Sequence, residues 1–159
     1  GDSAKLTARS DPLTMRDWGQ YDQQQALLQH ILIQYPARPL VIVGHSSGGN
    51  LTGLAPLTAE VDALILIASG GCDWRDYPPI HRLRLLLAVW RIGMPVVLSL
   101  LGYLPSRPGV GHPLLHGVAS EWRRWSLTRG YHFNDPTLDT NGYDAYTGPL
   151  LALSKFDDL

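Results

Sequence analysis

The chain has 159 residues, of which 45% are hydrophobic and 17% charged, enough apolar material for one ordinary globular domain. This composition excludes a disordered or fibrous chain. The net charge of -1 provides no basic field, so we expect no nucleic-acid partner. The single Cys72 cannot form an internal disulfide, and we therefore expect a reducing, cytoplasmic location.

The first half of the chain predicts alternating helices and strands. Apolar side chains recur at near-helical spacing over residues 17–35 and predict an amphipathic helix that stops at Pro36. Residues 40–43 and 61–68 are short apolar runs without regular alternation, typical of strands buried on both faces of a parallel sheet. Between them, the Gly-rich residues 47–54 indicate a crossover helix.

The second half of the chain interrupts this alternation with a long insertion and then resumes it with one strand. Residues 150–153 predict one more strand, and residues 70–147 before it read as an insertion. Within the insertion we expect helical segments near residues 81–90, 96–103 and 118–128. The predicted fold class is therefore α/β, with a core of residues 1–69 and 148–159 and a helical insertion between them.

One motif points to chemistry. The run Gly44-His45-Ser46-Ser47-Gly48 fits G-x-S-x-G, follows an apolar strand directly and precedes a helix of small residues. A sharp turn of this kind strains the backbone of its central serine and brings the residues two before and two after it too close for side chains. Ser46 is therefore the candidate nucleophile, and the backbone N–H of Ser47 is a candidate oxyanion donor. The alternative is a Gly-rich turn that only needs small residues.

Residues 41–50, VIVGHSSGGN, resemble the nucleophile elbow of the α/β-hydrolase superfamily. Among its branches, the chain is most similar to uncharacterised bacterial hydrolases related to serine aminopeptidases and monoacylglycerol lipases. The resemblance implies a partial α/β-hydrolase fold with residues 70–147 as the helical cap or lid, and with Gly1-Asp2-Ser3 ending the loop after the family's fourth strand. It also implies a serine hydrolase for a carboxylic ester or a small amide, working without a cofactor.

The family order of the triad is serine, then acid, then histidine. The resemblance places Asp158 on the acid position, with Asp157 as the neighbouring possibility. All six histidines precede Asp158 and none follows it. We therefore expect these residues to be the middle of a longer hydrolase, inactive by themselves and lacking the base and the second oxyanion donor. The alternative is a non-catalytic binding domain that keeps the hydrolase scaffold.

Two other features of the sequence could suggest a metal site and a membrane-spanning segment. His112 and His116 are four residues apart, but Pro113 disfavours a helix there and no Glu accompanies them, so we expect no metal site. Residues 85–104 contain the single charge of Arg91 and are long enough to span a bilayer.

A central arginine costs about 2.5 to 3.5 kcal/mol on insertion into a bilayer. Gly93 and Pro95 also interrupt the run of residues 85–104. We therefore expect two cap helices that meet at a kink, and no stable membrane insertion. The insertion also carries Trp90, Tyr103, Trp122 and Trp125. These aromatic side chains predict a small-molecule substrate with an apolar portion.

Overall fold

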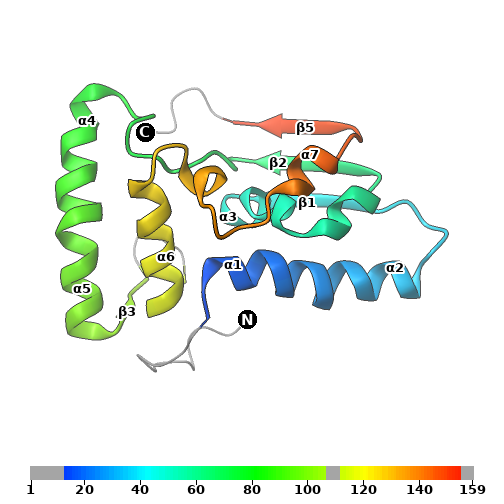
Figure 1. Cartoon of the computed structure of the whole chain (residues 1–159), viewed down its shortest axis with the longest axis horizontal. Helices are drawn as coiled ribbons and strands as arrows, with labels where there is room; N and C mark the ends of the chain where they lie inside the picture. The colour runs from blue at the N-terminus through cyan, green and yellow to red at the C-terminus, as the bar shows by residue number, and fades with distance from the viewer. Residues whose placement is uncertain (1–12, 107–111, 155–159) are drawn as a thin grey trace. The chain divides into compact units, whose positions relative to one another are not determined.

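The computed structural model describes residues 13–106 and 112–154, without the side chains of residues 24–27. The described chain forms two compact units. One combines residues 16–71 with 136–154 and is called here the sheet unit; the other consists mainly of residues 72–135 and is called the helical unit. Figure 1 shows the helices and strands of both.

The sheet unit is built on three parallel strands in the order β1 (Val41–His45), β2 (Ala63–Ile67) and β5 (Leu150–Leu153). Gly44 pairs with Leu66, and Leu66 with Ala152. The three predicted strands and their parallel arrangement are confirmed. Parallel strands end at the same edge of a sheet, so the motif that follows β1 lies at the carboxyl edge.

Helices connect these strands. The chain enters the sheet unit through one continuous helical segment made of α1 (Met15–Asp17), the wider π-type η2 (Trp18–Gln29) and α2 (His30–Gln34). Three short helices link β1 to β2, namely α3 (Ser47–Asn50), η3 (Thr52–Leu54) and η4 (Pro56–Glu60). The buried core of this unit consists of Leu28, Ala55, Val61 and Leu64, with Ile42 packed against it.

The prediction that the strands are buried on both faces is wrong for the described chain. In β1 and β2 alternate residues point into the core, as Leu64 does, whereas Val43 is 61% exposed; all four residues of β5 are exposed, with Leu151 at 51%. The register places Val43 beside Ile65 and Ile65 beside Leu151, so these residues share one face. The reason is that the core of helices and turns packs on the Ile42 and Leu64 side of the sheet.

The helical unit contains one long helical segment, the helix α6 and the short helix η6. The long segment is made of α4 (Pro79–Arg84), η5 (Leu85–Arg91) and α5 (Gly93–Leu101). A two-stranded antiparallel ribbon, β3 (Tyr103–Leu104) and β4 (Leu114–Leu115), leads into α6 (His116–Leu127) and the short helix η6 (Tyr131–Asn134). Trp90, Met94, Leu98, Leu104 and Ala119 form its core.

The expected kink between two helices is absent from Pro79–Leu101, which runs as one coil in Figure 1. η5 is a π-helix, and the Ile92 N–H closes its last wide turn by donating to the Leu87 carbonyl at 3.0 Å, five residues back. Gly93 permits this turn, since a Cβ there would lie 2.1 Å from the Ala88 carbonyl oxygen. Pro95 falls in the first turn of α5, where its missing N–H is tolerated.

This segment is also the one helix in the described ranges that is long and apolar enough to cross a membrane, with a mean hydropathy of 1.7. That finding concerns length and composition only. Helices of this kind occur as core helices of other proteins, where they are mostly buried, but only 17% of its most apolar window is buried here.

The boundary of the helical unit differs from that of the predicted insertion. The unit ends at Asp135, and α7 (Asn141–Ala145) packs against η3 and η4 in the sheet unit. The hydroxyl of Tyr143, in α7, donates to the carbonyl of Asn50. This long-range contact assigns residues 136–147 to the sheet unit.

Candidate active site

Ser46 occupies a strained turn at the carboxyl end of β1. Its backbone angles are φ 52° and ψ -128°, a conformation that residues other than glycine rarely adopt. The Ser46 N–H donates to the Ile67 carbonyl at 2.9 Å, and the Asn50 N–H donates to the Ser46 carbonyl at 3.0 Å. Ser46 is exposed, so the turn presents its hydroxyl to solvent.

The close approach that this turn requires lies between Gly44 and Gly49. A Cβ on Gly44 would lie 2.3 Å from the Gly49 Cα, whereas a Cβ on Gly48 would meet nothing within 4 Å. The assignment of the steric role to Gly48 is therefore wrong, because the first turn of α3 carries Gly49, and not Gly48, back against the end of β1. Gly49 is also confined by the Ser69 hydroxyl, 2.2 Å from a Cβ at that position.

Side chains from distant segments hold the turn in place. The Gln23 amide of η2 and the Thr52 hydroxyl both donate to the Gly48 carbonyl, at 2.7 and 3.0 Å. The Asn50 amide donates to the Gly70 carbonyl at 3.3 Å, and the Tyr143 hydroxyl donates to the Asn50 carbonyl at 2.5 Å. Burial raises the pKa of Tyr143, so its hydroxyl stays protonated and remains a donor.

Sequence reasoning did not find these supporting residues, and no local signal marks them. Gln23 lies 25 residues before its acceptor in the sequence, and Tyr143 lies 93 residues after its own. A glutamine on a helix and a tyrosine near a turn have many ordinary roles. Only the folded arrangement brings them to α3.

Ser47 is the first residue of α3, and its backbone N–H lies in the first turn of that helix. The first N–H groups of a helix have no acceptor within the helix, so they point outward and can bind an anion. The N–H of Ser47 is adjacent to Ser46 in the chain. It therefore stays the candidate donor to an oxyanion formed on an acyl group attached to Ser46.

The other residues predicted for the site either lie outside the described chain or, within it, are not hydrogen-bonded to the Ser46 hydroxyl. Asp157, Asp158 and Gly1-Asp2-Ser3 lie outside the described residues. His45 is exposed at the end of β1, where it pairs in register with Ile67. Within residues 13–106 and 112–154, no histidine is hydrogen-bonded to the Ser46 hydroxyl, and His132 is buried among aromatic rings of the helical unit.

The aromatic side chains expected to shape the substrate site pack inside the helical unit. Trp90 is 4% exposed and Trp125 is fully buried. The rings of Trp90 and Trp122 meet edge to face with centroids 5.1 Å apart. These three tryptophans form the unit's own interior, so they give no support to an apolar substrate pocket.

No group of three or more potential ligands that could hold a metal ion is found in the part of the chain that the structure describes. His116 begins α6, and its Nδ1 lies 3.4 Å from the Ser120 hydroxyl on the same helix. His112 precedes β4 and is exposed.

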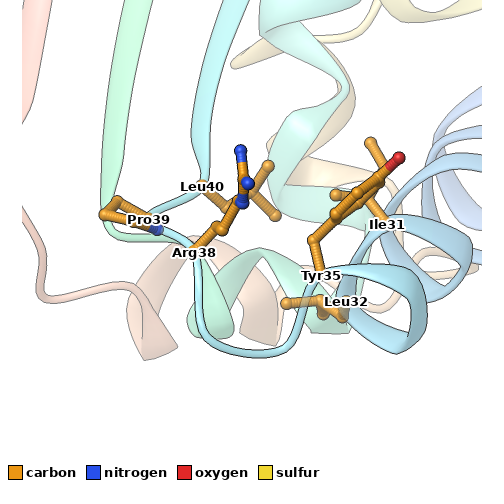
Figure 2. A pocket seen from close by; sticks show the side chains of 6 residues that line it. All are labelled: Ile31, Leu32, Tyr35, Arg38, Pro39 and Leu40. Carbon is orange, nitrogen blue, oxygen red and sulfur yellow. The ribbon is translucent and has the colours of Figure 1, made fainter.

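A shallow hollow of about 220 Å³ lies at the opposite end of β1. It is lined by Ile31, Leu32, Tyr35, Arg38, Pro39 and Leu40, and in Figure 2 the side chains of Tyr35 and Arg38 extend in the same direction beside it. Leu40 precedes the strand and Ser46 follows it, and five strand residues span roughly 16 Å. The hollow is therefore separate from the serine turn.

A strained serine between a parallel strand and a helix, at the carboxyl edge of the sheet, defines an α/β protein of the hydrolase type. The model of the alpha/beta hydrolase family matches residues 3–158, which is nearly the whole chain. The chain therefore belongs to the alpha/beta hydrolase family. Searches of the curated proteins and of the solved structures gave no significant match.

Proposed function

We propose that this alpha/beta hydrolase is a serine hydrolase of the esterase, lipase or aminopeptidase type, acting on a carboxylic ester or a small amide with Ser46 as its nucleophile. The observation that carries the proposal is the positive φ of Ser46 at the carboxyl end of β1. A non-glycine residue holds such a conformation only when the surrounding structure maintains it, and such residues cluster at active sites. The G-x-S-x-G spacing around the same serine agrees with this role.

The proposed reaction has two stages. The Ser46 oxygen attacks the acyl carbon while a general base takes its proton, and the N–H of Ser47 donates to the oxyanion. The tetrahedral intermediate then releases an alcohol or amine, which receives that proton, and leaves an acyl-serine. Water attacks the acyl-serine by the same route and releases the acid. Asp158, or its neighbour Asp157, would orient the base.

The nucleophile is tested with a fluorophosphonate probe, which attaches covalently to activated serines. We expect the full-length gene product to be labelled and its Ser46→Ala variant to lose labelling by at least about a thousandfold. Ser47→Ala is the matched control, because alanine keeps the backbone N–H that serves the oxyanion. Equal labelling of the parent and Ser46→Ala, read by in-gel fluorescence, would exclude Ser46 as the nucleophile.

The general base has its own test. All six histidines precede the proposed acid, contrary to the family order, so we expect the 159 residues alone to hydrolyse a p-nitrophenyl ester at a negligible rate. Fast hydrolysis by these residues that Ser46→Ala removes would instead show that one of the six histidines is the base. Substitution of each histidine would then identify it.

The same histidine order favours a second candidate, a binding domain that keeps the hydrolase scaffold without catalysis. A full-length gene product that carries no histidine after Asp158, and that shows neither probe labelling nor ester turnover, would support it. The place of the chain near serine aminopeptidases and monoacylglycerol lipases, the apolar portion of the substrate, the absence of a cofactor and the cytoplasmic location stay predictions from the sequence.

A further inference from the structure

One side of the long segment Pro79–Leu101 carries large aliphatic side chains that do not pack against the protein. This aliphatic stripe consists of Ile80, Leu83, Leu87, Ile92, Val96 and Leu100. Ile80 is 81% exposed and Leu100 is 73% exposed. The core residues Trp90, Met94 and Leu98 of the same segment are all at most 4% exposed, so the segment has one packed side and one exposed side, both apolar.

The wide turn keeps the stripe on one side of the helix. Most stripe residues follow one another at helical spacings of three or four, but Leu87 and Ile92 are five apart. In a regular α-helix, residues five apart point in different directions. Here the Ile92 N–H bonds to the Leu87 carbonyl, and the next turn closes with the Val96 N–H on the Ile92 carbonyl at 3.0 Å. The wide turn therefore brings Leu87, Ile92 and Val96 into line.

The charges around the stripe have one sign. Arg82, Arg84 and Arg91 lie on the same segment and are exposed. The sequence has no aspartate or glutamate between Asp76 and Glu121. An exposed apolar stripe on a helical segment whose only charged side chains are cationic complements a surface that is apolar beneath and anionic on top.

The packed side argues for a peripheral and against a membrane-spanning arrangement of the folded helical unit. Trp90 packs edge to face on Trp122 of α6, and the Arg123 guanidinium donates to the Trp90 carbonyl at 2.5 Å. Turning every side of the segment toward lipid would break these contacts. One side of the helix therefore stays packed within the helical unit, and only the other side is exposed to a partner.

We propose that the aliphatic stripe binds the surface of an anionic phospholipid bilayer, with the segment Pro79–Leu101 lying parallel to it. The stripe enters the boundary between headgroups and acyl chains, and Arg82, Arg84 and Arg91 contact the lipid phosphates. This binding places the hydrolase at a lipid surface as a peripheral protein. It makes no use of Ser46, so it is tested independently of the proposed catalysis.

The test is flotation of the full chain with vesicles of about three parts phosphatidylcholine to one part phosphatidylglycerol, beside vesicles of phosphatidylcholine alone. We expect the protein to float with the anionic vesicles, to bind them at least about fivefold more tightly than the neutral ones, and to be partly released by high salt. Absence of binding to both vesicle types would overturn the proposal, as would equal binding to both.

Substitutions test whether vesicle binding depends on the stripe or on other exposed apolar residues. Ile80→Glu with Leu100→Glu is expected to weaken vesicle binding at least about tenfold, because carboxylates replace the two most exposed stripe residues. Ile33→Glu is the matched control, since Ile33 is also on a helix and 67% exposed, but lies in α2 of the sheet unit. Circular dichroism checks that each variant is folded. An equal loss in the control would contradict the assignment to the stripe.

The arginines are tested separately. Arg84→Gln with Arg91→Gln is expected to remove the preference for anionic vesicles, whereas Arg38→Gln, exposed in the sheet unit, keeps it. A retained preference in the double variant would contradict the role of these charges. Self-association of the parent without lipid, abolished by Ile80→Glu with Leu100→Glu, would assign the stripe to a second copy and overturn the lipid proposal.

Discussion

At the scale of single residues, the serine turn shows how the fold maintains an unfavourable backbone conformation. The conformation of Ser46 costs on the order of 1–3 kcal/mol. Hydrogen bonds to Ile67 and from Asn50 hold it, and the contact between Gly44 and Gly49 leaves room only for glycine. The strain is offset by the strand and the helix on either side, so the turn depends on their packing.

We expect Gly44→Ala to destabilise the protein and Gly48→Ala to leave it intact. The methyl group at position 44 would collide with the backbone of Gly49, which should lower the free energy of unfolding by at least about 2 kcal/mol and abolish probe labelling. At position 48 the methyl group meets open space, and the change in stability should stay within about 1 kcal/mol. Urea unfolding followed by circular dichroism measures both, and equal losses would contradict the Gly44–Gly49 contact.

At the scale of elements, a buried polar and aromatic cluster joins α6 to η6. The Trp125 indole donates to Asp135 at 2.8 Å, and Arg124 forms an ion pair with Asp135 at 2.5 Å. The His132 ring lies 5.4 Å from the Trp125 ring and 4.2 Å from the Phe133 ring. Burial lowers the pKa of His132 to about 4, although the nearby Asp135 carboxylate acts to raise it. His132 is therefore neutral in the folded unit at ordinary pH.

This shift predicts a pH-dependent stability for the helical unit. Between the ordinary histidine pKa near 6.5 and the folded value of about 4, His132 is protonated in the unfolded chain but neutral in the folded chain. The free energy of unfolding should thus fall as the pH drops through this window, by up to about 3 kcal/mol. Tryptophan fluorescence reports mainly on this unit, because four of the five tryptophans, Trp74, Trp90, Trp122 and Trp125, belong to it, whereas Trp18 lies in the sheet unit.

A neutral substitution isolates the contribution of His132. His132→Gln should flatten the decline of stability between about pH 6.5 and 4, whatever its effect on stability at neutral pH. His81→Gln, at an exposed position of the same unit, serves as the control and should keep the parent's decline. The same decline in all three proteins would assign it to other groups.

At the scale of the whole molecule, apolar surface is exposed on each of the two units. The stripe on the helical unit is one such surface, and the uncovered face of the sheet is the other. This face contains Val41, Val43, Ile67, Leu151 and Leu153, each at least 36% exposed. Contiguous apolar surface of this kind favours association in water.

We expect the uncovered sheet face to cause concentration-dependent association. Val43, at 61% exposure, lies in the middle of the edge strand β1, so Val43→Lys should shift the distribution toward monomer in sedimentation velocity. Val43→Ile keeps the apolar character and should associate as the parent does. Association that is insensitive to the lysine substitution would show that another surface drives it.

The three strands, the helix before them and the serine turn could be predicted from the sequence because local features determine them. Apolar runs at residues 40–43, 61–68 and 150–153 predicted the strands that the structure has at residues 41–45, 63–67 and 150–153. The G-x-S-x-G pattern after a strand marked Ser46, whose strained backbone agrees with that interpretation. Each of these signals lies within a few residues of the feature that it predicts.

Tertiary structure alone decided which residues confine the turn and which apolar surfaces are covered. Gly49, and not Gly48, meets Gly44 because the direction of the first helical turn sets that contact. The hydrogen bond from Tyr143 to Asn50 spans 93 residues of sequence, and this contact places residues 136–147 with the sheet. Apolar composition likewise cannot distinguish a packed side from an exposed one, because burial depends on the partners that the fold supplies.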